Sequence, residues 1–168
     1  ASIADNLVKY FKNDAQFEIK LIDSSNHPVA SQNVTFNING VFYSRQTDEN
    51  GIARLNINLA PGEYIVTATD PLTGLSMSYN ITVLPLLYGE DIVSFYMGDY
   101  DYSVKLVDGE GNAVPGQSIT FNINGYIYNR TTRDDGYAKL FINLMPGRYI
   151  VTAQYLDSKI SNEIIIFE

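Results

Sequence analysis

The chain of 168 residues contains no cysteine, no tryptophan and a single histidine. The absence of cysteine excludes disulfide bonds and thiol catalysis, so stability must come from packing or from another kind of cross-link. His27 lies in the turn SSNHP, and the second half of the chain has Asn112 at the corresponding place. We therefore expect His27 to be a solvated turn residue, and we predict no catalytic residue and no cofactor.

Basic residues are also scarce. Lys and Arg total 11 against 19 Asp and Glu, which leaves a net charge of −8. Nucleic acids and anionic membrane surfaces require clustered basic residues, so neither is expected as a partner. No apolar run approaches the roughly 18 residues of a spanning helix, so we predict no membrane insertion in this segment. The chain starts ASIADN, without Met or a charged leader, and we expect it to be part of a longer protein.

What the chain does contain is a repeat. The pentapeptide FNING occurs at residues 36–40 and again at residues 121–125. With a shift of 85, residues 6–68 match residues 91–153 at 29 of 63 positions without a gap, by direct count. We predict a tandem duplication of one domain, with domains at residues 1–84 and 85–168.

Each repeat has the pattern of an all-β domain. Apolar residues alternate with polar ones in QFEIKLID at residues 16–23, turn residues recur every 8–12 positions, and no amphipathic helix of three turns is present. About seven short antiparallel strands predict an immunoglobulin-like β-sandwich in each repeat, with a small closed barrel as the alternative. In the first repeat the predicted strands are residues 6–12, 16–23, 33–38, 41–47, 52–59, 63–69 and 77–83.

FNING predicts a β-hairpin. Asn-Gly between two apolar strands is typical of a type I′ turn, because both central residues need a positive φ. We assign these turns to Asn39–Gly40 and Asn124–Gly125, with Asn37 and Asn122 on the outward side. On the other side we expect the core-facing residues Phe36, Ile38, Val41 and Tyr43 in the first repeat, and Phe121, Ile123, Tyr126 and Tyr128 in the second.

Arg45 and Arg130 are shared by the repeats and fall on the predicted core-facing side of these hairpins. An inward charge needs a partner. We predict that each Arg pairs with a carboxylate or with backbone carbonyls at the edge of its sandwich, and the candidate carboxylates are Asp23 for Arg45 and Asp108 for Arg130.

The run TFNINGVFYSRQTDENGIARLNINLAPGEYIVTA resembles repeat domains of the large adhesin-like surface proteins of methanogenic archaea. So do the lead-in DNLVKYFKNDAQFEIKLID and the closing SYNITV. The resemblance implies an extracellular stalk or adhesive module, in tandem arrays attached to a cell envelope. The second repeat departs from the lead-in, with Ser94 and Met97 in place of Lys9 and Lys12.

An internal isopeptide bond is a second hypothesis for stability without cysteine. Many Gram-positive surface domains join a Lys on a strand of this kind to an Asn on the last strand. Related domains supply a catalytic acid where this chain has Ala68 and Ala153, and strand alternation places the Lys opposite the core, so we do not favour the bond. The candidates are Lys20 with Asn80, and Lys105 with Asn162.

Acidic turns and sequons complete the candidate sites. DGEGN at residues 108–112 and RDDG at 133–136 lack the distant bidentate Glu of a calcium loop, so we interpret them as plain turns and predict no metal site. Asn33, Asn80 and Asn129 begin Asn-x-Thr sequons and are candidates for glycosylation.

The residues that the repeats share are mostly apolar, Gly and Pro, which argues against an enzyme. We therefore predict a stalk or adhesive segment of a cell-surface protein, with neighbouring repeats as partners. The alternative is a module that binds carbohydrate or a surface protein of another cell. Its surface would lie where the repeats differ, and Tyr and Asn suit both partner classes. The candidates in the second repeat are Tyr100, Tyr102, Tyr126 and Tyr137.

Overall fold

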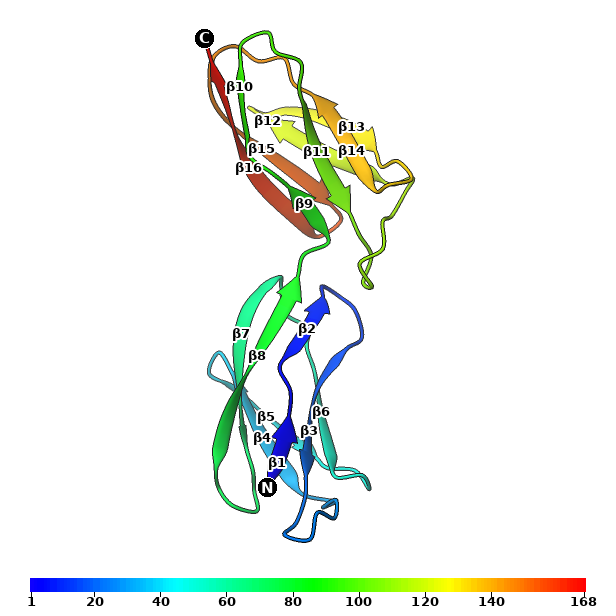
Figure 1. Cartoon of the computed structure of the whole chain (residues 1–168), viewed down its shortest axis with the longest axis vertical. Coiled ribbons are helices and arrows are strands. Elements are labelled where there is room, and N and C mark those ends of the chain that lie inside the picture. The colour runs from blue at the N-terminus through cyan, green and yellow to red at the C-terminus, as the bar shows by residue number, and fades with distance from the viewer. The chain divides into compact units, whose positions relative to one another are not determined.

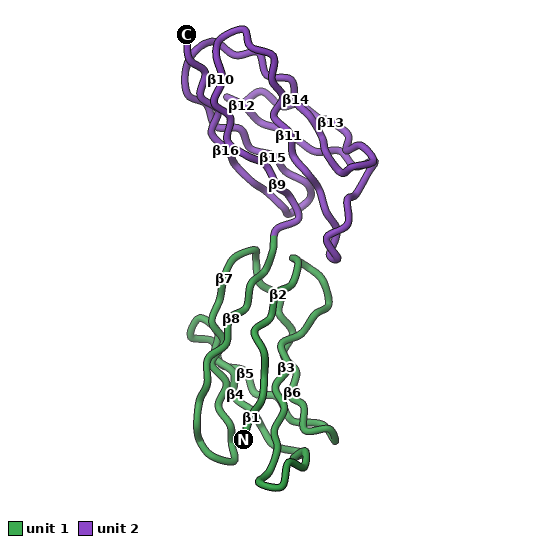
Figure 2. The backbone as a smooth tube through the Cα atoms, viewed as in Figure 1, with its two compact units in different colours: residues 1–84 green, residues 85–168 purple.

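A computed structural model describes all 168 residues, which form sixteen β-strands and no helix (Figure 1). The chain divides into two compact units, residues 1–84 and 85–168, called unit 1 and unit 2 below (Figure 2). With no helix at all, it has none suited to crossing a membrane.

Unit 1 contains eight strands: β1 (Ser2–Ala4), β2 (Leu7–Tyr10), β3 (Gln16–Leu21), β4 (Asn33–Ile38), β5 (Val41–Gln46), β6 (Ile52–Asn56), β7 (Gly62–Thr69) and β8 (Ser76–Leu84). Unit 2 repeats them as β9 (Leu87–Gly89), β10 (Ile92–Phe95), β11 (Asp101–Leu106), β12 (Ser118–Ile123), β13 (Tyr126–Thr131), β14 (Tyr137–Phe141), β15 (Gly147–Tyr155) and β16 (Ser158–Phe167).

Each unit is a two-layered immunoglobulin-like sandwich, as predicted. A three-stranded sheet, with the order β1-β3-β6, faces a five-stranded sheet, with the order β2-β8-β7-β4-β5. Unit 2 has the same two orders, β9-β11-β14 and β10-β16-β15-β12-β13. Every sheet has two free edges, so neither unit is a closed barrel.

The structure has one strand more than predicted at the start of unit 1: β1 precedes the predicted strand at residues 6–12, which corresponds to β2. β1 pairs antiparallel with β3 in one sheet, whereas β2 pairs parallel with β8 in the other. In unit 2, β10 likewise pairs parallel with β16. The N-terminal segment of each unit thus passes from one sheet to the other, which makes eight strands instead of seven and adds a parallel pair to an otherwise antiparallel sandwich.

The core of each unit lies between its two sheets. Alternation along β3 buries Phe17, Ile19 and Leu21, and β11 buries Tyr102, Val104 and Leu106. Aromatic rings meet edge to face across the layers, with centroids 6.0 Å apart for Phe17 and Phe36 and 5.9 Å apart for Tyr102 and Phe121. These apolar clusters supply the main stabilisation of a chain without disulfides.

The shared motif Pro-Gly-x-Tyr forms a tyrosine corner at the start of β7 and β15. The hydroxyl of Tyr64 donates to the carbonyl of Ala60 at 2.7 Å, and that of Tyr149 donates to the carbonyl of Met145 at 2.7 Å. A Tyr that bonds back to the preceding loop is a hallmark of immunoglobulin-like sandwiches. The motif is therefore explained by the fold.

Candidate functional site

The most distinctive surface of unit 2 lies along its edge strand β13. The Asn124–Gly125 turn has φ angles of 54° and 84°, as a type I′ turn requires, and aligns Tyr126 with Ile123 and Tyr128 with Phe121. The predicted register is thus confirmed. Asn122 accepts a hydrogen bond from the amide of Gly125 at 3.0 Å, so the outward Asn of FNING closes its own turn.

The prediction that these tyrosines enter the core is wrong. Tyr126 is 70% exposed and Tyr128 is 39% exposed, although both lie on the same side of the sheet as the buried Ile123. The reason is the number of strands in each layer. Three strands cannot cover five, so the fifth strand has no strand opposite its inner face. The same holds in unit 1, where Val41 and Tyr43 are exposed rather than buried.

The uncovered face of β13 forms one wall of an open groove with a volume of about 300 Å³. Its floor is the edge of the apolar core, contributed by Ile123, Leu140 and Ile142. Three exposed aromatic residues also line the groove: Tyr126 and Tyr128 from β13, and Phe141 from β14, whose side chain points to the other face of its strand from Leu140 and Ile142. A ligand in this groove would contact aromatic faces and a desolvated floor together. We call it the β13 groove.

Arg130 lines the same groove, but it does not pair with Asp108. Its guanidinium carbon lies 5.7 Å from the ring centre of Tyr128, and its Nη1 donates to the carbonyl of Asn129 at 2.8 Å. Arg45 makes the same contacts with Tyr43 and Ser44. The prediction of an inward Arg is wrong for the same reason as for the tyrosines: the inner face of the fifth strand is open to solvent.

Asp23 and Asp108 have another role. The carboxylate of Asp108 accepts the amides of Glu110 and Asn112, each at 2.9 Å, and Asp23 accepts those of Ser25 and His27. These backbone hydrogen bonds lower the pKa of both carboxyls. Both carboxylates therefore hold turns.

The place in unit 1 that corresponds to the β13 groove is less aromatic. Val41 stands where unit 2 has Tyr126, and Asn56 stands where unit 2 has Phe141. The amide oxygen of Asn56 is occupied by Gln16, whose Nε2 donates to it at 2.6 Å. The aromatic wall is thus a property of unit 2. An aromatic residue at a position predicted to face solvent, such as Phe141, is the signal that could have identified it.

The four tyrosines predicted as one binding surface do not lie together. Tyr126 lies in the β13 groove, whereas Tyr137 lies near Lys105, whose Nζ is 5.8 Å from its ring centre. Tyr100 is half-buried against the core of unit 2. Tyr102 is completely buried, so its assignment to a partner-binding surface is wrong. Since Tyr102 follows the alternation of β11, its inward direction could have been recognised.

Tyr102 instead begins a chain of polar contacts. Its hydroxyl donates to Oδ1 of Asn162, and Nδ2 of Asn162 donates to Oδ1 of Asp91 at 3.0 Å. Asp91 also accepts the amide of Glu163, and these two hydrogen bonds lower its pKa. Burial, with a smaller contribution from the charge of Asp91, raises the pKa of Tyr102 to about 12. Tyr102 is therefore a neutral hydrogen-bond donor at ordinary pH.

The structure contradicts both candidate isopeptide bonds. Lys20 is exposed between the buried Ile19 and Leu21 of β3, and Asn80 is exposed before the buried Ile81 of β8. Because neighbouring residues of a strand point to opposite faces, both project from the outer faces of their sheets, which are two different sheets. Two stacked sheets lie about 10 Å apart, which places these side chains on opposite sides of the sandwich. In unit 2, Asn162 bonds Tyr102 and Asp91, whereas Lys105 lies over Tyr137.

The lysine that is buried is Lys9, with only 3% of its surface exposed. Its Nζ donates to the carbonyls of Asn13 and Ile57 at 2.7 and 2.8 Å. Desolvation lowers its pKa, while the charge of Asp14 acts in the opposite direction. Lys9 thus connects the end of β2 to the segment that follows β6.

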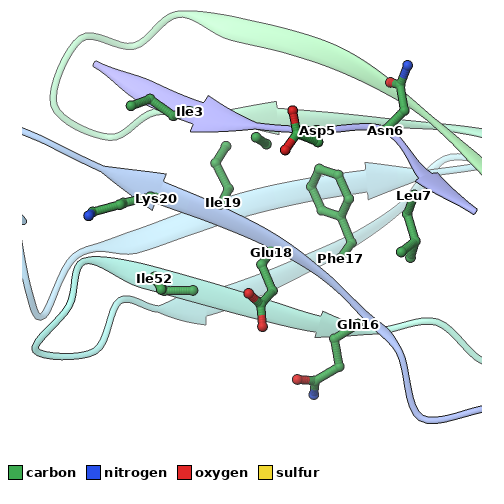
Figure 3. A pocket seen from close by; sticks show the side chains of 11 residues that line it. Ile3, Asp5, Asn6, Leu7, Gln16, Phe17, Glu18, Ile19, Lys20 and Ile52 are labelled. Atoms are coloured by element: carbon green, nitrogen blue, oxygen red, sulfur yellow. The ribbon is translucent and has the colours of Figure 1, made fainter.

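A second hollow occurs where the N-terminal segment changes sheets. In unit 1 it has a volume of about 300 Å³ and lies beside Phe17 and Ile19, with Asp5 and Asn6 at its rim (Figure 3). β1 pairs with β3 only as far as Ile19, which leaves the beginning of β3 without a partner on that side. Unit 2 has a hollow of about 390 Å³ at the same place, so it is a consequence of the fold.

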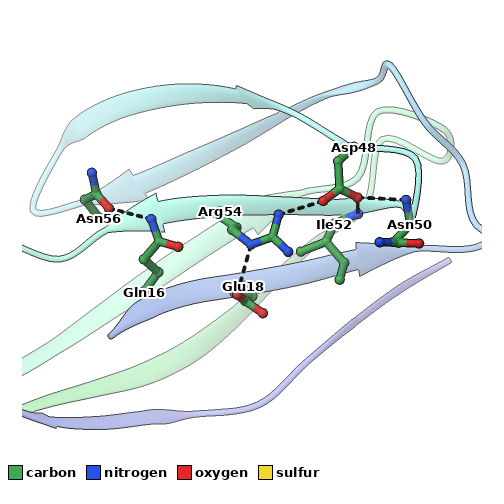
Figure 4. A network of polar contacts seen from close by, with 7 residues as sticks. All are labelled: Gln16, Glu18, Asp48, Asn50, Ile52, Arg54 and Asn56. Atoms are coloured by element: carbon green, nitrogen blue, oxygen red, sulfur yellow. Dashed lines mark hydrogen bonds and ion pairs between the residues drawn. The ribbon is translucent and has the colours of Figure 1, made fainter. Parts of the chain in front are cut away.

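A polar network covers the outer face of β3 and β6 in unit 1 (Figure 4). Arg54 bonds Glu18 at 3.1 Å and Asp48 at 2.6 Å, and Asp48 also accepts the amides of Asn50 and Ile52. The hydrogen bond from Arg54 is the largest cause of a lowered pKa at Asp48. Every charged group here is paired within the network.

The remaining predicted positions are widely separated. Asn33, Asn80 and Asn129 are all exposed, and glycosylation at these three sequons stays a prediction. His27 is exposed in its turn, with Nδ1 3.8 Å from Asp23. No group of three or more His, Cys, Asp or Glu side chains is arranged to hold a metal ion.

The chain is similar to known proteins in fold and not in sequence family. No family model and no curated protein matches the chain. Among solved structures, the titin Ig tandem A164–A165 is 10% identical, with a TM-score of 0.38 over 99% of this chain and 97% of that one. Invasin, a bacterial integrin-binding protein, is 21% identical, with a TM-score of 0.42. That match covers 99% of this chain and only 38% of the invasin chain. Domains 4 and 5 of the S-layer protein SbsC are 14% identical, with a TM-score of 0.34 over 99% and 96% of the two chains.

Proposed function

We propose that this chain is an extracellular tandem module of a large adhesin-like cell-surface protein, of the kind found in methanogenic archaea, and that it supports and presents adhesive surfaces without catalysis. The duplication supports a mechanical role. Residues shared by the two repeats lie mainly in the cores and turns, such as Phe36, Leu55 and Val66 and their copies. Selection for a repeated active site would favour shared polar clusters instead.

The observation that carries this proposal is the parallel pairing of the first long strand with the last in each unit. Leu7–Tyr10 pairs with Ile81–Leu84, and Ile92–Phe95 pairs with Ile164–Phe167. Since the two strands run in the same direction, a force that pulls the ends of a unit apart slides them past each other. All hydrogen bonds of the pair then resist together, whereas an antiparallel hairpin opens one bond at a time.

Single-molecule force spectroscopy of the full chain tests this role. Tyr96 donates its amide to Phe167, and alternate residues of a strand direct their amides to the same side, so the Ser94 amide also faces β16. Ser94→Pro removes that donor and should lower the unfolding force of unit 2, while unit 1 keeps its own. Val93→Pro is the matched control, because the Val93 amide faces away from β16. Equal forces for the wild type and Ser94→Pro would contradict a mechanical role for the parallel pair β10 and β16.

The cell-surface location requires its own test. An antibody against this chain should label intact cells that express the parent protein, without permeabilisation. Label that appears only after permeabilisation would exclude the proposed location.

A second candidate function is binding at the β13 groove. It is favoured by Tyr126, Tyr128 and Phe141, which are exposed around an apolar floor. Beads coated with the chain should adhere to partner cells, and Tyr126→Ser together with Phe141→Asn should reduce adhesion. The paired change Val41→Ser and Asn56→Ser in unit 1 is the control. Adhesion that survives the unit 2 changes would place the contact elsewhere.

A further inference from the structure

β13 presents an open backbone edge. It is the last strand of its sheet, it pairs regularly with β12 over six residues, and all six residues are exposed. Residues 127, 129 and 131 direct their amides and carbonyls away from β12, and of these groups only the carbonyl of Asn129 has a hydrogen-bond partner, Nη1 of Arg130. Proteins usually protect an edge of this length with proline, a bulge or several charges. The strand YIYNRT has one charge and none of the other devices.

The side chains beside this edge are spaced to receive a strand. Tyr126, Tyr128 and Arg130 alternate along the inner side of β13, next to the apolar floor of the groove. An added strand would lie beyond β13, and every second side chain of it would lie next to Tyr126, Tyr128 and Arg130 at the outer margin of the groove. The backbone edge and the aromatic groove thus form one continuous surface.

The charge at the end of this surface indicates the chemistry of its occupant. Arg130 contacts a neutral carbonyl and a tyrosine ring, so no carboxylate compensates its charge. It stands out on a chain with a net charge of −8. A guanidinium in this setting favours a carboxylate on the partner. The same strand of a second copy, YIYNRT, would bring another Arg130 and no carboxylate to this edge, so it does not supply the missing opposite charge.

We propose that β13 accepts an extended acidic segment of a partner polypeptide as an added sixth strand, with a partner carboxylate at Arg130. This inference rests on the proposed binding role of the β13 groove. The backbone of the segment pairs with the edge of β13, and its alternate side chains pack beside Tyr126 and Tyr128 at the margin of the groove. The shared edge motif Tyr-x-Arg at Tyr43 and Arg45 provides a matched, less aromatic surface in unit 1.

The test uses the full chain and a fluorescein-labelled ten-residue peptide of alternating valine and glutamate. Anisotropy should show saturable binding, and hydrogen exchange should slow at the outward-facing amides of residues 126–131. The same peptide N-methylated at alternate residues should lose binding, because it can no longer donate to the edge. This control changes the probe and leaves the protein fold intact.

Variants locate the charge. Arg130→Gln should weaken binding about threefold, as expected for an exposed ion pair, and the equivalent peptide with lysine in place of glutamate should bind more weakly to the wild type. Arg45→Gln is the matched control and should bind as the wild type does. Circular dichroism confirms that each variant is folded.

Several results would overturn the inference. Equal binding of the N-methylated peptide excludes strand addition, and equal effects of Arg45→Gln and Arg130→Gln exclude unit 2 as the specific site. A doubling of the mass in solution that blocks the peptide would identify a second copy as the occupant. Two outcomes would refute the polypeptide partner and leave the proposed binding role intact. In the first, the peptide fails to bind while coated beads still adhere through the groove. In the second, the groove binds only glycans on an array. Failure of both peptide binding and bead adhesion refutes the two together.

Discussion

Unit 1 and unit 2 fill the same place in their cores with different chemistry. Phe17 in unit 1 packs against Tyr79, with ring centroids 5.5 Å apart. Tyr102 occupies the position of Phe17 in unit 2, and its hydroxyl bonds Asn162, which occupies the position of Tyr79. An aromatic contact has thus been exchanged for a buried hydrogen bond without a change in strand order. The fold constrains the space available, and the pair of residues decides how that space is stabilised.

The exchange extends to a third position. Ala4 of unit 1 corresponds to Gly89 of unit 2, since they pair with Ile19 and Val104 in equivalent registers. A Cβ atom at Gly89 would lie only 2.7 Å from the hydroxyl oxygen of Tyr102 and 2.8 Å from Oδ1 of Asn162. The missing methyl group therefore makes room for the hydrogen bond, and the three positions behave as one coupled set.

The largest expected effect tests what the units share. Gly51 and Gly136 have φ angles of 77° and 82°, and a Cβ there would lie 2.6 and 2.7 Å from the carbonyl oxygens of Leu21 and Leu106. Gly51→Ala and Gly136→Ala should each cost their own unit about 3 kcal/mol, from the left-handed backbone and the clash together. Hydrogen exchange of core amides measures each unit separately. A large loss of unfolding free energy in only one unit would show that the two glycine turns do not contribute equally to their units.

The next prediction concerns a contact that only unit 1 has. Lys9→Met keeps the length of the side chain but leaves the carbonyl of Ile57 without its buried donor. Unit 1 should lose about 2 kcal/mol of unfolding free energy, whereas Lys12→Met, at an exposed position, should change it by less than about 0.5 kcal/mol. Denaturant unfolding followed by the exchange of unit 1 amides makes the measurement. Similar losses for the two variants would mean that the buried hydrogen bonds contribute nothing specific.

The coupled positions Gly89, Tyr102 and Asn162 of unit 2 should show a smaller loss of stability, and its size should depend on which residues occupy positions 102 and 162. Gly89→Ala alone should destabilise unit 2 by about 1.5 kcal/mol, because the added methyl group overpacks the hydrogen bond. In a Tyr102→Phe, Asn162→Tyr background, which reproduces unit 1, the same change should be nearly neutral. The difference between the two backgrounds is the coupling free energy. If Gly89→Ala costs the same in both, the three positions act independently.

The smallest effect concerns the surface network of unit 1. Arg54 lowers the pKa of Asp48, so the folded state favours the ionised carboxylate. This contribution is fully present above the ordinary Asp pKa of about 4 and is lost as the pH falls through the lower pKa of the folded state. Arg54→Met should therefore reduce the stability of unit 1 slightly at pH 7 and less near pH 2. Lys139→Met is the control in unit 2, where Arg133 replaces Asp48. A loss that grows with acid would contradict this sign.

The comparison also separates what could be predicted from what could not. Alternation and turn residues located the later strands of unit 1 within a few residues, and Asn-Gly set the hairpin register between Phe36 and Tyr43. The same alternation led to the wrong placement of Tyr43 and Arg45 toward the core. Alternation tells which side of a sheet a residue faces, but whether another sheet covers that side depends on how many strands lie opposite.

The buried polar contacts could not be predicted from the sequence for a similar reason. Lys9 reaches Ile57, 48 positions later in the chain, and Tyr102 reaches Asn162, 60 positions later. Neither partner can be chosen from local pattern, because the contact exists only once the two sheets are stacked. The split of the N-terminal segment between two sheets depends on the same stacking.

By itself, the sequence determined the duplication, the all-β character, the Asn-Gly turns and the periodic core, because each depends on local backbone preference or on the alternation of side chains along a strand. Only the tertiary structure decided that the inner face of β13 is uncovered, that Tyr102 is buried, and that Arg130 lies beside a groove instead of a carboxylate. These facts follow from the stacking of a three-stranded sheet on a five-stranded sheet, and the sequence of a single strand does not predict that stacking.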